Sequence, residues 1–423
     1  MDNFYMTGMD VVREKISGKN LDEPKFEKIL QEIISEDLGE IERLVKAASF
    51  LTACQTRGLD LYELNSWVRA MVNVGEKIHW GPDYFDQKIL DKHCVGGVPG
   101  NRTTPIIASI IAANGLLMPK SSSRAITSPS GTADMMDVLT NVKLNINQIR
   151  KVLDQEGACL VWGGNMGLAP ADQFLIQVEK ILNLNFLEQI VVSIMAKKIA
   201  FGSSHIVIDL PIGPDIKINS EMKAQEISRL LKSIAAVMGV HLLIKTSDGS
   251  RPIGSGIGPC LEARDVLRIL KQEKDLNKNL EKKALEFSGY LLEFAGACAP
   301  GMGFGLAQNT LNSGMAWAKF QKICEAQGGL KSPGLAVYQH TVRAKDFKDL
   351  KNINLNCAVI SRLAKIVGAP INKEAGVDLH IEIGRFEKIE KDQEILTLHS
   401  NSKELLDQGL AYLMSQDWVT RKL

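Results

Sequence analysis

The chain has 423 residues, of which 45% are hydrophobic and 23% are charged, so it is long enough for two or three globular domains. Its 50 basic and 49 acidic residues give a net charge of +1. This balance lacks the excess of basic residues that is typical of proteins that bind nucleic acid or an anionic membrane. The apolar runs are too short to span a bilayer, the N-terminus lacks a secretory signal, and the seven cysteines form no CxxC pair. We therefore expect a cytoplasmic protein that acts on small molecules and holds no metal.

Residues 8–75 predict a small helical domain. Pro24 suits the first turn of a helix, and the apolar residues after it follow at spacings of three and four, as on one helix face. Two further helical segments end in Gly58 and Gly75, which we expect to cap them.

Residues 91–104, DKHCVGGVPGNRTT, predict a phosphate cradle. Lys92, His93 and Cys94 precede a loop with three glycines and a proline, and the apolar segment that follows predicts a helix. Backbone that approaches an oxyanion needs residues without a Cβ, and a helix start offers unpaired N–H groups to the anion. Glycine pairs also close many ordinary turns, so this interpretation needs support from another segment.

A hydroxyl-rich segment at residues 119–134, PKSSSRAITSPSGTAD, provides that support. Its serine and threonine hydroxyls can donate short hydrogen bonds to phosphate or sugar oxygens, and Arg124 can bind an oxyanion in bidentate fashion. The alternative is a solvated serine-rich surface loop. Such loops rarely follow so closely on an apolar helix and a glycine-rich turn, so we favour a binding segment.

From about residue 88 the sequence predicts an α/β domain. The runs at 158–162, 205–210 and 241–247 are almost continuously apolar, as in strands buried on both faces. Helical stretches lie between them, which favours a parallel or mixed sheet. The histidines that begin the last two runs are expected to be structural: His205 and His241.

The rest of the chain predicts helices and a C-terminal α+β domain. A helical block at 172–200 interrupts the α/β pattern and is expected to return to the first helical domain, and charged helices fill about 260–330. Residues 335–423 predict short alternating strands with a helix near 356–368. These strands are expected at 337–345, 380–384 and 394–400.

Several segments together carry a family resemblance. They read DKHCVGGVPGNRTT, PKSSSRAITSPSGTADMM, CLVWGGNMGLAPAD, SIMAKKIAFGSSHIVIDLPIG and TSDGSRPIGSGIGP. The chain resembles, from near residue 6 to its end, the thymidine and pyrimidine-nucleoside phosphorylase family, and most closely its AMP-phosphorylase-like branch. The resemblance implies a helical domain facing an α/β domain with a central mixed or parallel sheet across a cleft, and a C-terminal α+β domain. It also implies a homodimer formed through the helical domain.

We accordingly place three domains along the chain. Residues 1–75 and about 166–200 form the helical, dimer-forming domain. About 76–165 and 201–334 form the α/β domain that binds phosphate, and 335–423 form the C-terminal α+β domain. Members of the AMP branch usually carry a further N-terminal domain, which we expect this chain to lack.

The reaction that the resemblance implies is phosphorolysis of an N-glycosidic bond. Inorganic phosphate is the co-substrate and attacks the anomeric carbon as the base leaves, and no other cofactor is expected. By position, the resemblance implies phosphate contacts at Lys92, Cys94, Ser122 and Thr132. It implies nucleotide contacts at Gly97, Ser123, Arg124, Ala125, Ile126, Thr127, Ser128, Thr132, Ser193 and Lys217, and a base contact at Lys197. His93 matches a residue that approaches the base or sugar.

Three departures from the family pattern bear on activity. Cys94 replaces a serine, and a thiol is a weaker donor than a hydroxyl. Asn185 stands where the AMP enzymes place an aspartate that protonates the leaving base, and an amide cannot serve as that acid. Glu179 stands about where the thymidine enzymes have an arginine that reads the pyrimidine.

The sequence therefore supports a phosphorylase acting on a nucleoside or a nucleoside 5′-monophosphate. The product would be a free base with ribose or deoxyribose 1-phosphate, or with ribose 1,5-bisphosphate in the AMP-type reaction. One alternative is a nucleotide- or phosphate-binding protein of the same fold with impaired catalysis. Another is a phosphoribosyl transferase with the same domain layout.

Overall fold

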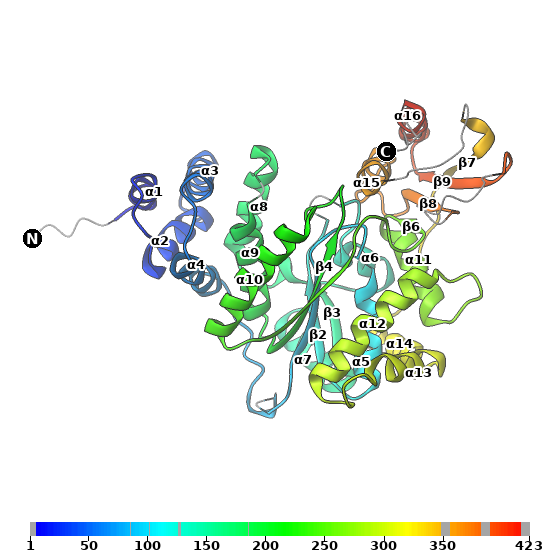
Figure 1. Ribbon diagram of the computed structural model, residues 1–423, viewed down its shortest axis with the longest axis horizontal. Coiled ribbons are helices and arrows are strands. Elements are labelled where there is room, and N and C mark those ends of the chain that lie inside the picture. Colours follow the sequence, from blue (N-terminus) through cyan, green and yellow to red (C-terminus); the bar gives the residue numbers. More distant parts are fainter. Residues whose placement is uncertain are drawn as a thin grey trace, which may run out of the picture. The chain divides into compact units, whose positions relative to one another are not determined.

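The computed structural model describes residues 6–84, 86–100, 102–125, 128–184, 186–347, 356–381 and 390–415 (Figure 1). The chain divides into two compact units, each assembled from segments that lie far apart in the sequence. Unit 1 comprises Met1–Asp91, Gly163–Ile206 and Gln225–Leu242, and unit 2 comprises Lys92–Trp162, Val207–Ala224 and Leu243–Leu423.

Helices build most of unit 1, as the sequence predicts for residues 8–75. They are α1 (Gly8–Ile16), α2 (Glu23–Ile34), α3 (Glu40–Arg57), α4 (Leu61–Asn73), α8 (Pro170–Leu182), α9 (Leu187–Ala200) and most of α10 (Glu221–Met238). Trp67 of α4 stacks on Phe26 of α2 with ring centroids 5.8 Å apart, and it meets Phe50 of α3 edge-on at 5.1 Å. All three rings are fully buried, so an aromatic cluster joins these helices.

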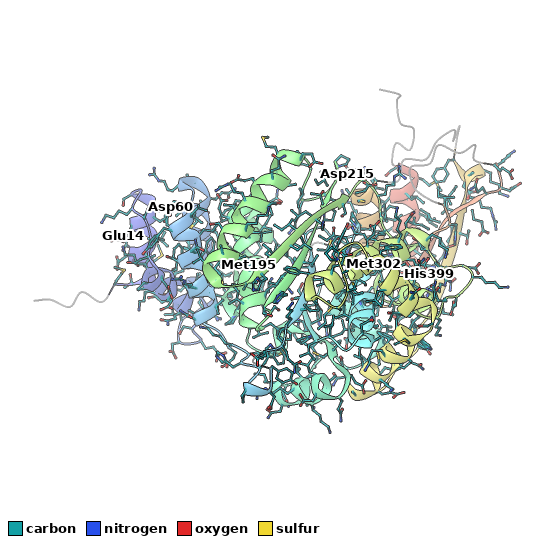
Figure 2. All side chains as sticks on the ribbon, turned by 60° about the horizontal axis from the view of Figure 1, so that its bottom comes forward. Glu14, Asp60, Met195, Asp215, Met302 and His399 are labelled. Atoms are coloured by element: carbon teal, nitrogen blue, oxygen red, sulfur yellow. The ribbon has the colours of Figure 1, made fainter. Side chains whose placement is uncertain are left out.

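One of the two glycine caps predicted for unit 1 is confirmed, and an aspartate caps the start of another helix. Asp60, labelled in Figure 2, caps α4 in a capping box with Glu63. Gly58 caps α3 with a φ of 71°, as predicted. The prediction for Gly75 is wrong, because the C-cap of α4 is Val74. Gly75 instead packs tightly: a Cβ there would lie 2.6 Å from Pro170 Cδ.

The chain passes between the two units along the strands of a three-stranded sheet. These strands are β1 (Leu90–Cys94), β4 (His205–Ile212) and β5 (His241–Asp248), in the order β1-β4-β5. The N–H of His205 donates to the Ile89 carbonyl, and the N–H of Val95 donates to the Asp209 carbonyl. Residue numbers thus rise together along β1 and β4, so these strands are parallel. Each of the three strands begins in unit 1 and ends in unit 2.

The apolar runs form the expected strands, but only some are fully buried. β4 is buried along almost its whole length, as is β3 (Ala158–Trp162). β5 is half-buried with exposed positions, so the expectation of burial on both faces is wrong for this strand. β5 is the last strand in the sheet order, and among the described residues no strand pairs with its outer side, which leaves that backbone edge uncovered.

A second parallel pair and four surrounding helices belong to unit 2. β2 (Met118–Ser122) pairs with β3 in register from Met118 opposite Ala158 to Ser122 opposite Trp162. The apolar segment after the predicted cradle forms α5 (Thr103–Ala113), which is buried on all sides. The other helices near this pair are α6 (Thr132–Leu139), α7 (Ile146–Glu156) and α11 (Pro259–Leu270). The charged region that follows forms α12 (Lys278–Ala295), α13 (Gly303–Asn312) and α14 (Met315–Ala326).

The C-terminal residues form a four-stranded antiparallel sheet in the order β6-β8-β9-β7, with two helices. The elements are β6 (Gly256–Ile257), β7 (Tyr338–Arg343), α15 (Cys357–Ile366), β8 (Gly376–Leu379), β9 (Glu394–Ser400) and α16 (Lys403–Ser415). β6 comes from well before residue 335, so this sheet takes a strand from across the predicted domain boundary. The strand predicted at 380–384 is instead β8, because Val377 and Leu379 supply the side chains buried in this core. Residues 382–384 lie outside the described residues.

Candidate active site

Lys92 is the centre of a buried polar cluster in unit 2. Side chains alternate along β1, and Lys92 is 0% exposed. Its ammonium donates to the Thr103 hydroxyl at 2.9 Å and to the Gly100 carbonyl at 3.5 Å. Thr103 is the first residue of α5 and donates in turn to the Gly100 carbonyl. The predicted loop and the helix that follows it therefore meet at Lys92.

A carboxylate and a second lysine, neither of which is among the residues predicted from the sequence, complete this cluster. Asp209 of β4 is fully buried, and its Oδ2 lies 3.7 Å from Lys92 Nζ and 3.0 Å from Lys283 Nζ. The Ser247 hydroxyl also donates to Asp209. Burial alone would raise the pKa of Asp209, but Lys92, Lys283 and these hydrogen bonds hold the pKa below its ordinary value. The carboxylate is therefore ionised between two ammonium groups.

Cys94 follows Lys92 by two residues on β1 and shares its face of the strand. Burial raises the pKa of the Cys94 thiol to about 12, and the neighbouring Asp209 adds to the rise. The thiol is therefore protonated and available as a weak donor. A Cβ at Gly100 would lie 2.2 Å from Cys94 Sγ, so only glycine fits where the loop passes over this thiol.

The glycine loop lies beside the serine-rich segment. Gly97 has a φ of +34°, and a Cβ built on it would lie 3.8 Å from Ser128 Cβ. The two segments that the sequence singled out are thus neighbours within unit 2. β1 and β2, which belong to two different parallel pairings, both end here, and the carboxyl ends of parallel strands are the usual place for ligands in α/β folds.

Asp134 of α6 organises the serine-rich segment. Its Oδ2 accepts the N–H groups of Ala125 at 2.6 Å and Gly131 at 3.0 Å. Gly131 is the N-cap of α6, and Thr132 is its first residue. The Ser128 hydroxyl donates to the Ser130 carbonyl at 2.8 Å. These bonds fold the loop around the start of α6, where the N–H of Ala133 also donates to the Ser123 carbonyl at 3.4 Å.

Arg124 forms ion pairs with two carboxylates of the protein itself. Its two terminal nitrogens lie 3.0 Å from Asp134 and 3.1 Å from Asp137, and its guanidinium lies 5.0 Å from the centroid of the Trp162 ring. These contacts use both terminal nitrogens of the guanidinium, which we predicted from the sequence to bind an oxyanion. Ser122 donates to the Val161 carbonyl at 3.3 Å. Ile126 and Thr127 lie outside the described residues.

The residues matched to base contacts gather in unit 1. Ser193 and Lys197 lie one turn apart on α9 with their side chains hydrogen-bonded at 3.0 Å, on the helix where Figure 2 labels Met195. Lys197 also lies 2.8 Å from the buried carboxylate of Asp172 on α8. This carboxylate orients Lys197. Asn185 lies outside the described residues.

The remaining predicted residues occupy varied positions. His93 lies half-buried on β1, and Lys217 lies exposed in the connection between β4 and α10. Glu179 is half-buried on α8. His205 and His241 stack with ring centroids 4.5 Å apart at the starts of β4 and β5.

Comparisons with known proteins agree with the motifs. Residues 9–75 match the helical bundle domain of a glycosyl transferase family, and residues 86–238 match its a/b domain. A protein of Sphingopyxis alaskensis named "Putative thymidine phosphorylase" is 43% identical over 401 residues, which cover 95% of this chain and 76% of that protein. A protein of the same name from a Polaromonas species is 43% identical over 405 residues, covering 96% and 77%.

The chain belongs to this glycosyl transferase family. The resemblance drawn from the motifs is confirmed, and so is the predicted combination of a helical domain with an α/β domain. Among solved structures, anthranilate phosphoribosyltransferase from Thermus thermophilus superposes with a TM-score of 0.60 at 19% identity, over 75% of this chain and 99% of that one. The Saccharomyces cerevisiae enzyme of the same name, in complex with PRPP and Mg, gives 0.60 at 16% identity, over 75% and 97%. At these identities the likeness shows the fold alone.

Family membership makes the chain a glycosyl transferase. Within the part of the chain that the structure describes, no helix combines the length and the apolar character that crossing a membrane needs. Among the described residues of unit 2, the predicted site residues fall in or beside the buried cluster, the glycine loop or the serine-rich segment, except Lys217.

Proposed function

We propose that this chain catalyses phosphorolysis of the N-glycosidic bond of a nucleoside. An oxygen of inorganic phosphate attacks the anomeric carbon and forms the new C–O bond. The C–N bond breaks, and its electron pair leaves with the base, which then takes up a proton. The products are the free base and a pentose 1-phosphate. The observation that carries this proposal is the buried cluster of Lys92, Lys283 and Asp209 at the carboxyl end of the parallel strands.

This cluster suits phosphate because it places cationic donors at a glycine-rich turn. Lys92 has three N–H groups and makes hydrogen bonds to two acceptors, while Asp209 at 3.7 Å is too distant for a third. The remaining N–H is thus available for an anion. The Thr103 hydroxyl at the start of α5 contacts Lys92, so the N–H groups of that helix start can bind the same anion. We propose that the start of α6, with Thr132, contributes further donors.

We propose that Ser193 and Lys197 serve the leaving base. Negative charge develops on the base as the bond breaks, and a fixed ammonium stabilises it because the group is already oriented. Asp172 supplies that orientation through its 2.8 Å contact with Lys197. A pyrimidine base needs no strong acid when such donors are present.

A nucleoside fits the serine-rich segment better than a nucleoside 5′-monophosphate. Asp134 and Asp137 already bind both arms of Arg124, so a 5′-phosphate would have to displace them. The names of the curated relatives also point to thymidine. The AMP-type reaction is the second substrate class to test, because the SRAITS string resembles that branch.

The test is an assay of base release. Purified protein is incubated with inorganic phosphate and, separately, thymidine, uridine, AMP, CMP and UMP, and free base is separated by chromatography. We expect release from a pyrimidine nucleoside that depends on phosphate. Absence of phosphate-dependent release from all five would overturn the proposal. Nucleotide binding by calorimetry without turnover would instead indicate a binding protein, and product formed only from PRPP and a base would indicate a phosphoribosyl transferase.

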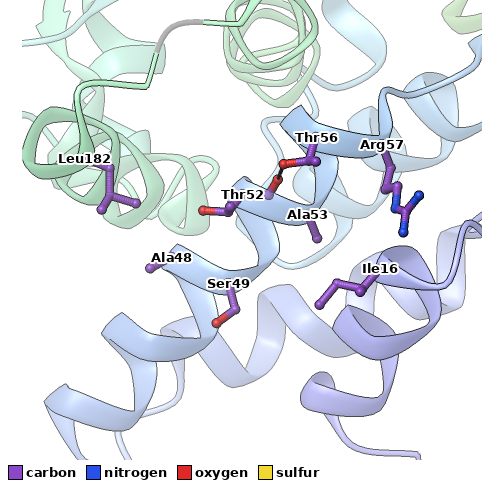
Figure 3. A pocket seen from close by; sticks show the side chains of 8 residues that line it. All are labelled: Ile16, Ala48, Ser49, Thr52, Ala53, Thr56, Arg57 and Leu182. Atoms are coloured by element: carbon purple, nitrogen blue, oxygen red, sulfur yellow. Dashed lines mark hydrogen bonds between the residues drawn. The ribbon is translucent and has the colours of Figure 1, made fainter.

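We further propose that the enzyme is a homodimer formed through unit 1 and acts in the cytoplasm. An apolar strip along α3, with Ile41 at 79% and Val45 at 52% exposure, supports the dimer, as do Ile181 and Leu182 at the end of α8. Beside it lies a cavity of about 450 Å³ (Figure 3), lined by Ile16, Ala48, Ser49, Thr52, Ala53, Thr56, Arg57 and Leu182. Apolar surface of this kind suits a protein contact. All seven cysteines are free thiols, as in a reducing compartment.

A further inference from the structure

Lys283 lies on α12, far along the chain from the predicted cradle, yet its side chain is only 7% exposed. Its ammonium lies 2.9 Å from the Pro99 carbonyl, 2.9 Å from the Ser247 hydroxyl and 3.0 Å from Asp209 Oδ2. These three partners come from the glycine loop, β5 and β4. One ammonium therefore ties the loop to two strands of the sheet.

The buried charges near Cys94 do not balance. The ionised groups that act on its thiol are Lys92, Lys283 and Asp209, two cations against one anion. The thiol itself stays neutral, because burial raises its pKa. Asp248 also acts on Lys283, but Asp248 is partly exposed and has Arg251 beside it. The cluster thus carries an excess positive charge in an apolar setting, where the Phe287 ring lies within 5.3 Å of Lys92 Nζ and 5.9 Å of Lys283 Nζ.

Burying an excess charge costs free energy unless an opposite charge neutralises it. The shared carboxylate oxygen lies 0.7 Å closer to Lys283 than to Lys92, from 3.0 Å and 3.7 Å. Asp209 is thus the partner of Lys283 more than of Lys92. This division leaves the charge of Lys92 for an anion that enters from the glycine loop.

We propose that Lys283 is a positioning residue of the phosphate site, which neutralises Asp209 so that Lys92 is free to bind inorganic phosphate. The inference rests on the proposed function, since it takes phosphate as the anion. Lys283 acts through Asp209, and it is not required to touch phosphate itself.

The first test is Lys283→Met, with phosphate affinity measured by calorimetry on the full chain. Without Lys283, Asp209 is left to pair with Lys92 and the cluster becomes neutral. We expect phosphate affinity to fall at least about tenfold, because a full unit charge is lost from a buried site. The KM for phosphate should rise in parallel, while the KM for the nucleoside should change by less than about twofold.

The matched control is Lys282→Met. Lys282 is the neighbour on the same helix, is 70% exposed, and lies 3.9 Å from Glu286 at the surface. This substitution removes the same charge from the chain without touching the cluster, so phosphate affinity should match that of the wild type.

The decisive variant is the double substitution Asp209→Asn with Lys283→Met. It removes one cation and one anion, so the net charge of the cluster returns to that of the wild type. We expect the phosphate affinity of the double variant to lie within about threefold of that of the wild type. Such a recovery would show strong coupling between the substitutions at Asp209 and Lys283. A role of Lys283 in folding alone predicts no such recovery. If Lys283→Met fails to fold, the double variant carries the test, since it buries no unpaired carboxylate.

The outcomes separate this inference from the function on which it rests. Wild-type affinity in Lys283→Met, or a double variant that binds phosphate no better than Lys283→Met or not at all, overturns the role of Lys283. Wild-type protein that neither binds phosphate nor releases base overturns the proposed function first. The two results that overturn the role of Lys283 leave phosphorolysis by the wild type intact, whereas the last result does not.

Discussion

Lys92 and Asp209 are both fully buried, and their charged atoms lie 3.7 Å apart. That separation is longer than a hydrogen bond, although both groups belong to neighbouring strands of one sheet. Lys92 instead donates to Thr103 and Gly100, and Asp209 is nearer to Lys283. The cluster therefore holds Lys92 beside the glycine loop without neutralising it, which is the condition for binding an anion there.

The first prediction concerns Lys92 itself. Lys92→Met removes the donor and the charge that face the phosphate, so kcat/KM for phosphate should fall by roughly 10²–10³-fold, the usual effect of losing one preorganised donor. Initial rates at varied phosphate measure this. Lys88→Met, at an exposed position ahead of β1, should leave the rate unchanged. Equal rates in Lys92→Met and the wild type would mean that phosphate binds elsewhere.

The fold and the loop that follows Lys92 were largely accessible from the sequence because they depend on local patterns. Helix spacing, caps such as Gly58, and apolar runs such as 158–162 determine local structure directly. The Lys92 loop was recognisable from its glycines. β5 was misjudged because its apolar run does not reveal that it is an edge strand, which depends on strand order.

The partners of Lys92 were harder to predict because they come from distant segments. Asp209 had a signal that was overlooked: it is the one acid in the apolar run of β4, and a charge in a buried strand requires a partner. Lys283 also lies on the buried side of α12, one turn from Leu280 and Phe287. Nothing local indicated that its ammonium reaches Pro99, 184 positions away.

A second prediction tests the carboxylate that folds the serine-rich segment. Asp134→Ala leaves the N–H groups of Ala125 and Gly131 without their acceptor. The free energy of unfolding should fall by about 1–3 kcal/mol, because two partly buried donors and the ion pair with Arg124 lose their partner. Urea denaturation followed by circular dichroism measures this change.

The control for Asp134 is another ion pair of similar length. Asp392 lies 2.8 Å from Lys345 but is 79% exposed. Surface pairs contribute little, so Asp392→Ala should not measurably change the unfolding curve. An Asp134→Ala protein as stable as Asp392→Ala would show that the segment does not depend on this carboxylate.

A third prediction concerns acid stability. His399 of β9, labelled in Figure 2, is 4% exposed, and neither ring nitrogen has a hydrogen-bond partner among the described residues. Burial lowers the pKa of His399 to about 4, with Arg264 adding to the effect. Between pH 6.5 and 4 the unfolded chain therefore binds a proton that the folded chain does not, and the free energy of unfolding falls as the pH falls.

His399→Leu should reduce this dependence by up to about 1.4 kcal/mol per pH unit, the value for one proton. Urea denaturation of wild type and variant at several pH values from about 7 to about 4.5 provides the comparison. His340→Leu, on the exposed face of β7, should retain the wild-type slope. Parallel slopes in wild type and His399→Leu would rule out a contribution from this histidine.

A fourth prediction tests the proposed dimer. Val45→Glu places a charge in the exposed apolar strip of α3, where burying it against a second copy would be costly. Sedimentation equilibrium should give a dimer mass for the wild type and a monomer mass for the variant. Val237→Glu, at a 48% exposed position of α10, should remain dimeric. A dimer that tolerates Val45→Glu would place the contact on another surface.

A fifth prediction separates the two substrate classes. The family resemblance implies that Asn185 stands where the AMP-phosphorylase branch has an aspartate, and general acid catalysis contributes typically about 10²–10⁴-fold. A purine leaving from AMP needs that proton, whereas a pyrimidine anion can be stabilised by hydrogen bonds from Lys197 and Ser193. Asn185→Asp should therefore raise phosphorolysis of AMP and have little effect on thymidine. Paired measurements of base release from the two substrates test this, and equal changes for both, or none, would show that position 185 does not protonate the leaving base.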